Sequence, residues 1–109
     1  MFAVGGIGAA GQMSEGEAAL REVLAAPDAV KHLEALLPRA SRAGQLYILL
    51  GLHIRDRAAY ERSLALCRQR GGRVETMRGC IGGRESFPDL VREIDSGELD
   101  ASVTRPWQR

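Results

Sequence analysis

The chain has 109 residues, of which 45% are hydrophobic and 27% charged, and a formal net charge of +1. A chain of this length has room for one hydrophobic core, so we expect a single domain over residues 1–109. The near-zero net charge excludes an overall attraction to nucleic acid or to an anionic membrane, and no stretch approaches the roughly 20 apolar residues that span a bilayer.

Residues 1–13 form a glycine-rich segment. Within it, Gly6-Ile7-Gly8-Ala9-Ala10-Gly11 matches the GxGxxG pattern of dinucleotide-binding turns, in which glycines let the backbone approach a pyrophosphate. Such a turn runs directly into a helix, and a second strand that ends in an acid follows about 20 residues later. The chain has neither feature, because Ser14 begins a new helix. We therefore expect no nucleotide and no other cofactor.

The same segment bears on the location of the protein. A signal peptide needs a basic start followed by an apolar run, whereas residues 1–11 carry no basic residue and are interrupted by glycines. We expect a cytoplasmic protein with no membrane partner, or an exported one if the start of the chain is mis-assigned.

Capping residues predict where the first three helices begin. Ser14, followed by Glu17, has the capping-box pattern, and Pro27-Asp28 ends this helix and starts a second one. Ser41 caps a third helix, whose residues 46–54 are apolar on almost every side, which is typical of a buried helix. We expect the core to be centred on this helix, at Leu46, Leu49, Leu50 and Ile54.

Two more helices are predicted in the second half of the chain. Asp56 is a capping residue for a fourth helix, which the glycine pair Gly71-Gly72 ends. Ser86 opens a fifth helix with its apolar residues at helical spacing.

The stretches around the fifth helix are less regular. Residues 73–77 alternate in the manner of a short extended piece, and the glycines around Cys80 indicate a loop. Residues 98–109 are expected to be a tail, anchored only by Val103 and Trp107.

Short connections require successive helices to turn back on one another. The expected fold is therefore all-α: a small bundle or short solenoid of about five helices. Four stretches carry a resemblance: Gly5-Gly6-Ile7-Gly8, residues 16–22, residues 44–52 and Gly79-Cys80-Ile81. Together they resemble short uncharacterised bacterial helical proteins, and the helix-hairpin layout is similar to HEAT-like modules. Neither resemblance implies an activity or a site residue.

The cysteines and histidines are few and scattered. His32, His53, Cys67 and Cys80 lack the spacing of a zinc site, so we expect no metal. In a reducing cytoplasm the two cysteines are expected to be free thiols, one buried on a helix and one in a loop, whereas export would let them pair. Cys80 lies between Arg78 and Arg84, and nearby positive charge lowers a thiol pKa, so a thiol enzyme or redox protein using Cys80 is one alternative function.

Arginines are concentrated in the middle of the chain. Eight lie between residues 55 and 84, against three acidic residues in the same stretch, and Lys31 is the only lysine of the chain. The guanidinium fork suits carboxylates and phosphates, yet no recognised DNA-binding motif is present. We expect a non-enzymatic module that binds a protein partner, acidic in character, through Arg62, Arg68, Arg70 and Arg73. A nucleic-acid-binding protein that uses the same arginines is the alternative.

Overall fold

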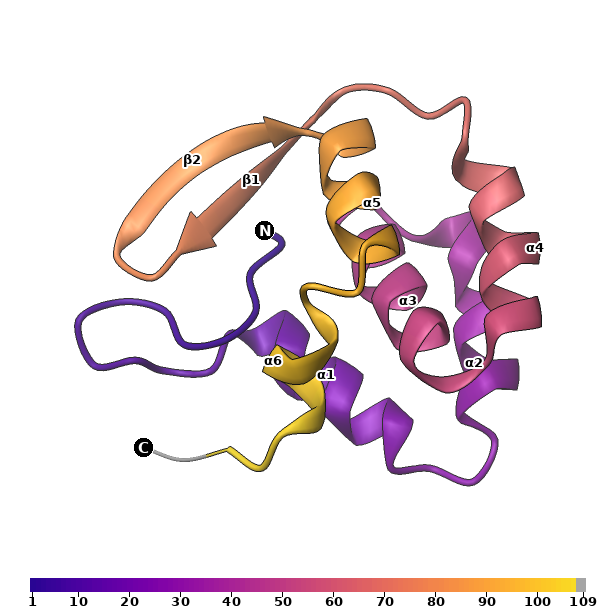
Figure 1. Ribbon diagram of the computed structural model, residues 1–109, viewed down its shortest axis with the longest axis horizontal. Coiled ribbons are helices and arrows are strands. Elements are labelled where there is room, and N and C mark those ends of the chain that lie inside the picture. Colours follow the sequence, from indigo (N-terminus) through magenta and orange to yellow (C-terminus); the bar gives the residue numbers. More distant parts are fainter. Residues whose placement is uncertain (108–109) are drawn as a thin grey trace.

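The computed structural model describes residues 1–107, which form six α-helices, a short 3-10 helix and one two-stranded antiparallel sheet around a common core (Figure 1). In chain order the elements are α1 (Glu15–Leu24), α2 (Ala29–Leu36), η1 (Leu37–Arg39), α3 (Arg42–Arg55), α4 (Arg57–Cys67), β1 (Arg73–Arg78), β2 (Ile81–Ser86), α5 (Phe87–Asp95) and α6 (Asp100–Thr104). No helix in residues 1–107 is long and apolar enough to cross a membrane.

Side-chain caps fix the starts of four helices where the sequence predicts them. Ser14, Ser41, Asp56 and Ser86 each accept the backbone N–H of the residue three positions on. Each cap satisfies a backbone donor that the first turn of a helix leaves without a partner. These contacts therefore set the boundaries of α1, α3, α4 and α5.

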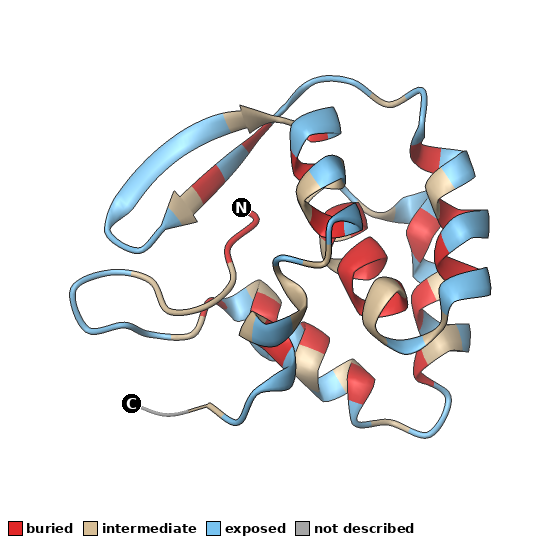
Figure 2. Ribbon diagram, viewed as in Figure 1, coloured by how far each residue is buried: buried red, intermediate tan, exposed pale blue. Residues whose placement is uncertain are grey.

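Helix α3 lies at the centre of the molecule and is buried on most sides (Figure 2). It contacts α1, α2, α4, α5, α6 and β1. Leu46, Leu49 and Leu50 are fully buried, and Ile54 packs half-buried at the end of the helix. The predicted centre of the core is confirmed at Leu46, Leu49 and Leu50, whereas Ile54 lies at its edge.

The all-α prediction is wrong, because β1 and β2 form an antiparallel hairpin. Arg78 pairs with Ile81 at one end and Arg73 with Ser86 at the other. Gly79 and Cys80 make the connecting turn. Gly79 has a φ of +60°, which glycine adopts without strain. The expected extended piece is β1, but the expected glycine loop is largely strand β2.

Strand β2 was not predicted because two of its residues are glycines. Gly82 and Gly83 pair through their backbones with Met77 and Thr76 and contribute no alternating side chains. All apolar burial in the hairpin comes from β1, where Val74 and Thr76 face inward. Hydrophobic alternation, which is the usual sign of a strand, is therefore missing from one of the two partners.

The N-terminal segment is docked against β1. The backbone N–H of Phe2 donates to the carbonyl of Glu75 at 2.9 Å, and the N–H of Gly8 donates to the carbonyl of Gly79 at 3.0 Å. Phe2 and Ala3 are buried. In Figure 1 the segment runs between the hairpin and α1, so it lies beside both elements.

The predicted tail contains a short helix, α6. Val103 is buried in the core, as expected of an anchor. Trp107 lies with its ring centroid 5.9 Å from the guanidinium carbon of Arg21. The last part of the predicted tail, residues 108–109, lies outside the described residues.

Candidate protein-binding groove

Two of the four predicted arginines each contact a residue of a neighbouring helix or strand. Arg62 on α4 pairs with Glu34 of α2, with Nη2 and Oε1 3.2 Å apart. Arg73 on β1 donates to the backbone carbonyl of Arg84 on β2 at 2.6 Å. Both side chains are exposed, and they contact different neighbours.

The other two predicted arginines lie together where α4 ends. Arg70 is half-buried and donates from Nη1 to Oε1 of Gln45 at 3.1 Å. Arg68 is exposed, and its guanidinium pairs with no acid among residues 1–107. Of the four predicted residues, Arg68 therefore presents the charge that is most available to a partner.

Arg68 and Arg70 line a groove between α4 and α5. The hollow has a volume of about 270 Å³, and its lining divides into an apolar and a polar group. The apolar residues are Leu64, Cys67, Phe87, Pro88 and Val91, and the polar residues are Arg68, Arg70, Arg92 and Asp95. Phe87 and Cys67 are buried, whereas Leu64 and Val91 are half-buried. The groove therefore has an apolar floor and a charged rim.

The backbone holds the two walls of the groove at a fixed distance. The chain leaves α4, passes through Gly71-Gly72 and enters β1, and the N–H of Phe87 donates to the carbonyl of Gly72 at 2.9 Å. This bond places the start of α5 beside the end of α4. The groove is thus a product of the hairpin, which returns the chain to α4 after 14 residues of β-structure and turn.

Two carboxylates near the rim have partners within the protein. The hydroxyl of Tyr60 donates to Oδ1 of Asp95 at 2.8 Å, and Arg92 pairs with Asp89 on the same helix. Burial, and then the hydrogen bond to Asp95, raises the pKa of Tyr60 well above its ordinary value. Asp89 balances the charge of Arg92, whereas Arg70 and Asp95 bond only to the neutral side chains of Gln45 and Tyr60 and keep their charges. Arg68 is the exposed rim arginine with neither an acid nor a hydrogen-bonded side chain as partner among residues 1–107.

Cys67 belongs to the floor of the groove and not to a thiol site. Burial raises the pKa of its thiol, and the nearby Arg70 opposes this shift only in part. A thiol with a raised pKa stays protonated at neutral pH and behaves as a small apolar side chain. Both cysteines are free, Cys67 buried and Cys80 exposed, as predicted.

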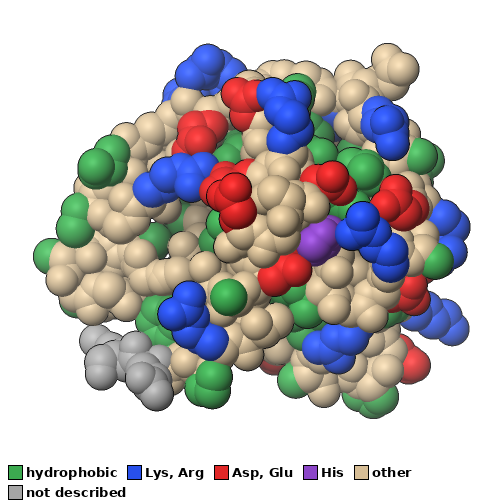
Figure 3. Space-filling view, in the orientation of Figure 1, with side chains coloured by type: hydrophobic (Ala, Val, Ile, Leu, Met, Phe, Trp, Pro, Cys, Tyr) green, Lys and Arg blue, Asp and Glu red, His purple; other side chains and the backbone are tan. Residues whose placement is uncertain are grey.

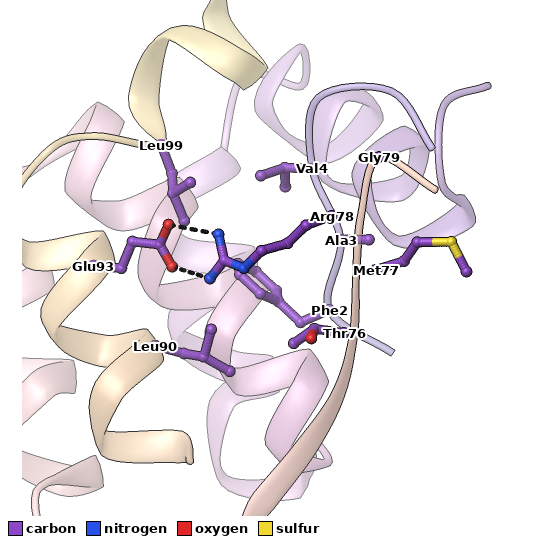
Figure 4. Close-up of a pocket in the computed structure, with 10 residues that line it drawn as sticks. All are labelled: Phe2, Ala3, Val4, Thr76, Met77, Arg78, Gly79, Leu90, Glu93 and Leu99. Atoms are coloured by element: carbon purple, nitrogen blue, oxygen red, sulfur yellow. Dashed lines mark hydrogen bonds and ion pairs between the residues drawn. The ribbon is translucent and has the colours of Figure 1, made fainter. Parts of the chain in front are cut away.

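A second cavity, of about 200 Å³, lies between the N-terminal segment, β1 and α5 (Figure 4). Arg78 reaches across it and makes two hydrogen bonds to Glu93, at 2.9 and 2.6 Å, and two to Glu85, both at 2.9 Å. These bonds raise the pKa of Arg78, and the bonds from Arg78 and then Thr76 lower the pKa of Glu85. One guanidinium thus bridges two carboxylates, Glu85 of β2 and Glu93 of α5, and the network joins the hairpin to α5.

Cys80 lies on the exposed turn between β1 and β2. The sequence places Arg78 close to it, but the guanidinium of Arg78 donates to Glu85 and Glu93 instead. Within residues 1–107 no group of three or more His, Cys, Asp or Glu side chains could hold a metal ion.

The glycine-rich segment packs on a buried carboxylate. Glu17 is fully buried, accepts the N–H of Gly5 at 2.7 Å and accepts Nε of Arg21 at 2.8 Å. Ile7 and Gln12 exchange backbone hydrogen bonds at 2.8 Å. The segment thus directs backbone donors to acceptors within the protein, namely the Glu17 carboxylate and backbone carbonyls.

His53 joins α3 to α6. Its Nδ1 lies 3.0 Å from Oδ1 of Asp100, and its Nε2 lies 3.2 Å from Nη1 of Arg57. The imidazole thus lies between the carboxylate of Asp100 and the guanidinium of Arg57. The three side chains satisfy one another and leave no group directed at a ligand.

Sequence reasoning missed Leu64, Pro88, Val91 and Arg92 as site residues. The periodicity of α4 and α5 gives the inward faces of both helices, but it does not show that the helices are neighbours. Leu64 on α4 and Val91 on α5 line one groove only because the hairpin brings the two helices together, and the sequence analysis did not predict the hairpin in full.

Comparison with known proteins adds no further constraint. No protein-family model, no curated protein and no solved structure matches this chain. The resemblance to short bacterial helical proteins therefore stays a prediction.

Proposed function

We propose that this protein is a non-enzymatic binding module whose groove between α4 and α5 takes an acidic segment of a protein partner. The observation that carries the proposal is the exposed Arg68 without an acidic partner among residues 1–107, beside a floor of Leu64, Val91 and Phe87. A peptide with one or two large apolar side chains next to Asp or Glu would match this arrangement.

The two parts of the groove would contribute differently. Burying apolar side chains of the partner on the floor favours the complex, because it removes apolar surface from water. Arg68 and its neighbours on the rim add charge complementarity, which raises the association rate and favours acidic over basic partners.

The nucleic-acid alternative uses the same arginines but has less support. A protein that binds phosphates presents a broad basic face, or aromatic side chains on which bases stack. On the face shown in Figure 3, acidic and basic side chains are interspersed. Arg62 is matched by Glu34 and Arg78 by two glutamates, which removes these two cations from an array that would contact consecutive phosphates.

Selection from a displayed library of random peptides tests the proposal. We expect the enriched sequences to combine acidic residues with a large apolar residue, and amide chemical shifts to change most along the facing sides of α4 and α5. Enriched peptides without acidic residues, or shifts centred on another surface, would contradict it. Binding of single-stranded oligonucleotides that weakens log-linearly with salt would favour the alternative instead.

A further inference from the structure

A second apolar hollow lies on a different surface, between α1, the end of α2 with η1, and the start of α3. Its volume is about 300 Å³. Apart from Arg39 and the Tyr47 hydroxyl, its lining is apolar: Gly16, Ala19, Leu20, Val23, Leu33, Leu36, Ala40, Gly44, Tyr47 and Ile48. It shares no residue with the groove between α4 and α5.

Small residues keep this hollow open. A Cβ built on Gly16 would lie 2.2 Å from the ring of Tyr47, so α1 approaches α3 as closely as glycine allows. Ala19, Ala40 and Gly44 continue the shallow floor. The result is a depression wide enough to receive aliphatic side chains from outside.

A hydrophobic ridge borders the hollow. Leu36, the last residue of α2, is 45% exposed although it belongs to the lining. Leu36 therefore adds exposed aliphatic surface to the edge of an apolar depression, and contiguous apolar surface of this kind is what protein interfaces bury.

The two rims carry opposite charges. On α1, exposed Glu15 and Glu22 flank Ala19 at four and three residues, so they lie along the same side of the helix. On the opposite rim, exposed Arg39 lines the hollow. One side of the hollow is thus acidic and the other is basic.

We propose that a second copy of this chain covers the hollow, with a two-fold axis parallel to its length. Under that symmetry the α1 rim of each copy lies over the η1 rim of the other, because the operation exchanges the two sides. Leu36 of each copy then enters the hollow of its partner, and Glu15 and Glu22 face Arg39 of the partner. A ridge beside a hollow and an acidic rim opposite a basic one are self-complementary only in this arrangement.

Sedimentation equilibrium of the full chain over about three decades of concentration tests the proposal. Wild type should shift from monomer to dimer as concentration rises, and Leu36→Glu should weaken the dimer by tenfold or more, since it places a charge in the apolar hollow. The matched control is Leu66→Glu, because Leu66 is 75% exposed on α4 and lies outside the hollow. It should dimerise as wild type does.

A charge exchange separates this geometry from other dimers. Glu22→Arg alone and Arg39→Glu alone should each weaken the dimer, and the double variant should recover most of the loss. A wild type that stays monomeric at every concentration overturns the proposal, as does a dimer that Leu36→Glu leaves unchanged or a double variant without recovery. These results do not depend on the peptide groove, whose binding Leu36→Glu should preserve.

Discussion

Arg70 donates from Nη1 to Oε1 of Gln45, 3.1 Å away, and Gln45 in turn donates from Nε2 to the carbonyl of Leu37 at 3.0 Å. Gln45 is buried, so its amide needs both partners. Arg70 is therefore the end of a bonded chain that links the end of α4 to η1 through α3. Arg68, two residues earlier, takes no part in it.

This contrast predicts different stabilities for two similar substitutions. Arg70→Ala should lower the free energy of unfolding by about 1–3 kcal/mol, because it leaves the buried Gln45 oxygen without its donor. Arg68→Ala should change it by no more than about 0.5 kcal/mol, as is usual for an exposed residue. Urea denaturation of both variants measures the difference, and equal losses would show that the two arginines play the same part.

The centrality of α3 predicts a large effect for a core truncation. Leu50 is fully buried, so Leu50→Ala should cost about 2–5 kcal/mol through lost apolar burial and the cavity that remains. Leu66→Ala, at a position 75% exposed, is the matched control and should change stability little. A urea midpoint for Leu50→Ala equal to that of wild type would place the core elsewhere.

The buried Glu17 predicts that the N-terminal segment depends on one carboxylate. Glu17→Ala removes the acceptor of the Gly5 N–H and of Arg21, and leaving buried donors unpaired should cost about 2–4 kcal/mol. Hydrogen exchange should accelerate at Gly5 and at Phe2, whose N–H bonds to β1. Glu17→Gln keeps an acceptor oxygen and should lose less. Unchanged exchange at Gly5 in the alanine variant would contradict this account.

The network around Arg78 predicts an acid-sensitive hairpin. Hydrogen bonds from Arg78 and Thr76 lower the pKa of Glu85 in the folded protein, so its contribution is present above the unfolded-state value of about 4.3 and is lost as pH falls through the folded-state value. Stability between about pH 6 and pH 3 should fall less in Glu85→Gln than in wild type. Glu75→Gln, at an exposed position on β1, should follow wild type. Parallel curves for Glu85→Gln and wild type would remove Glu85 from the acid response.

Local signals in the sequence were sufficient for helices α1 to α5 and for the centre of the core, but not for α6, which was predicted as part of a tail. Each cap is recognisable locally, because the capping side chain bonds to the residue three positions on, as at Ser14, Ser41, Asp56 and Ser86. The apolar faces of α3 can likewise be recognised from its own sequence alone. The hairpin escaped prediction because Gly82 and Gly83 pair only through their backbones, and the docking of Phe2 on β1 because it joins residues more than 70 positions apart.

The candidate site was predictable only in part for the same reason. The arginine-rich stretch was visible in the sequence, but the partners of its members were not. Glu34 lies 28 residues from Arg62 and Gln45 lies 25 residues from Arg70, and neither pairing has a local signal. The tertiary structure was therefore needed to distinguish Arg68, which has no partner among residues 1–107, from the arginines that have one.

The affinity of one selected acidic peptide for three proteins tests the central claim most directly. Calorimetric titration should give a dissociation constant at least about tenfold weaker for Arg68→Glu than for wild type, since reversing a rim charge that faces an acid costs about 1.4 kcal/mol or more. Arg55→Glu, a reversal at an exposed arginine outside the groove, should stay within about twofold of wild type. Equal affinities for Arg68→Glu and wild type, or equal losses in both variants, would contradict a binding site between α4 and α5.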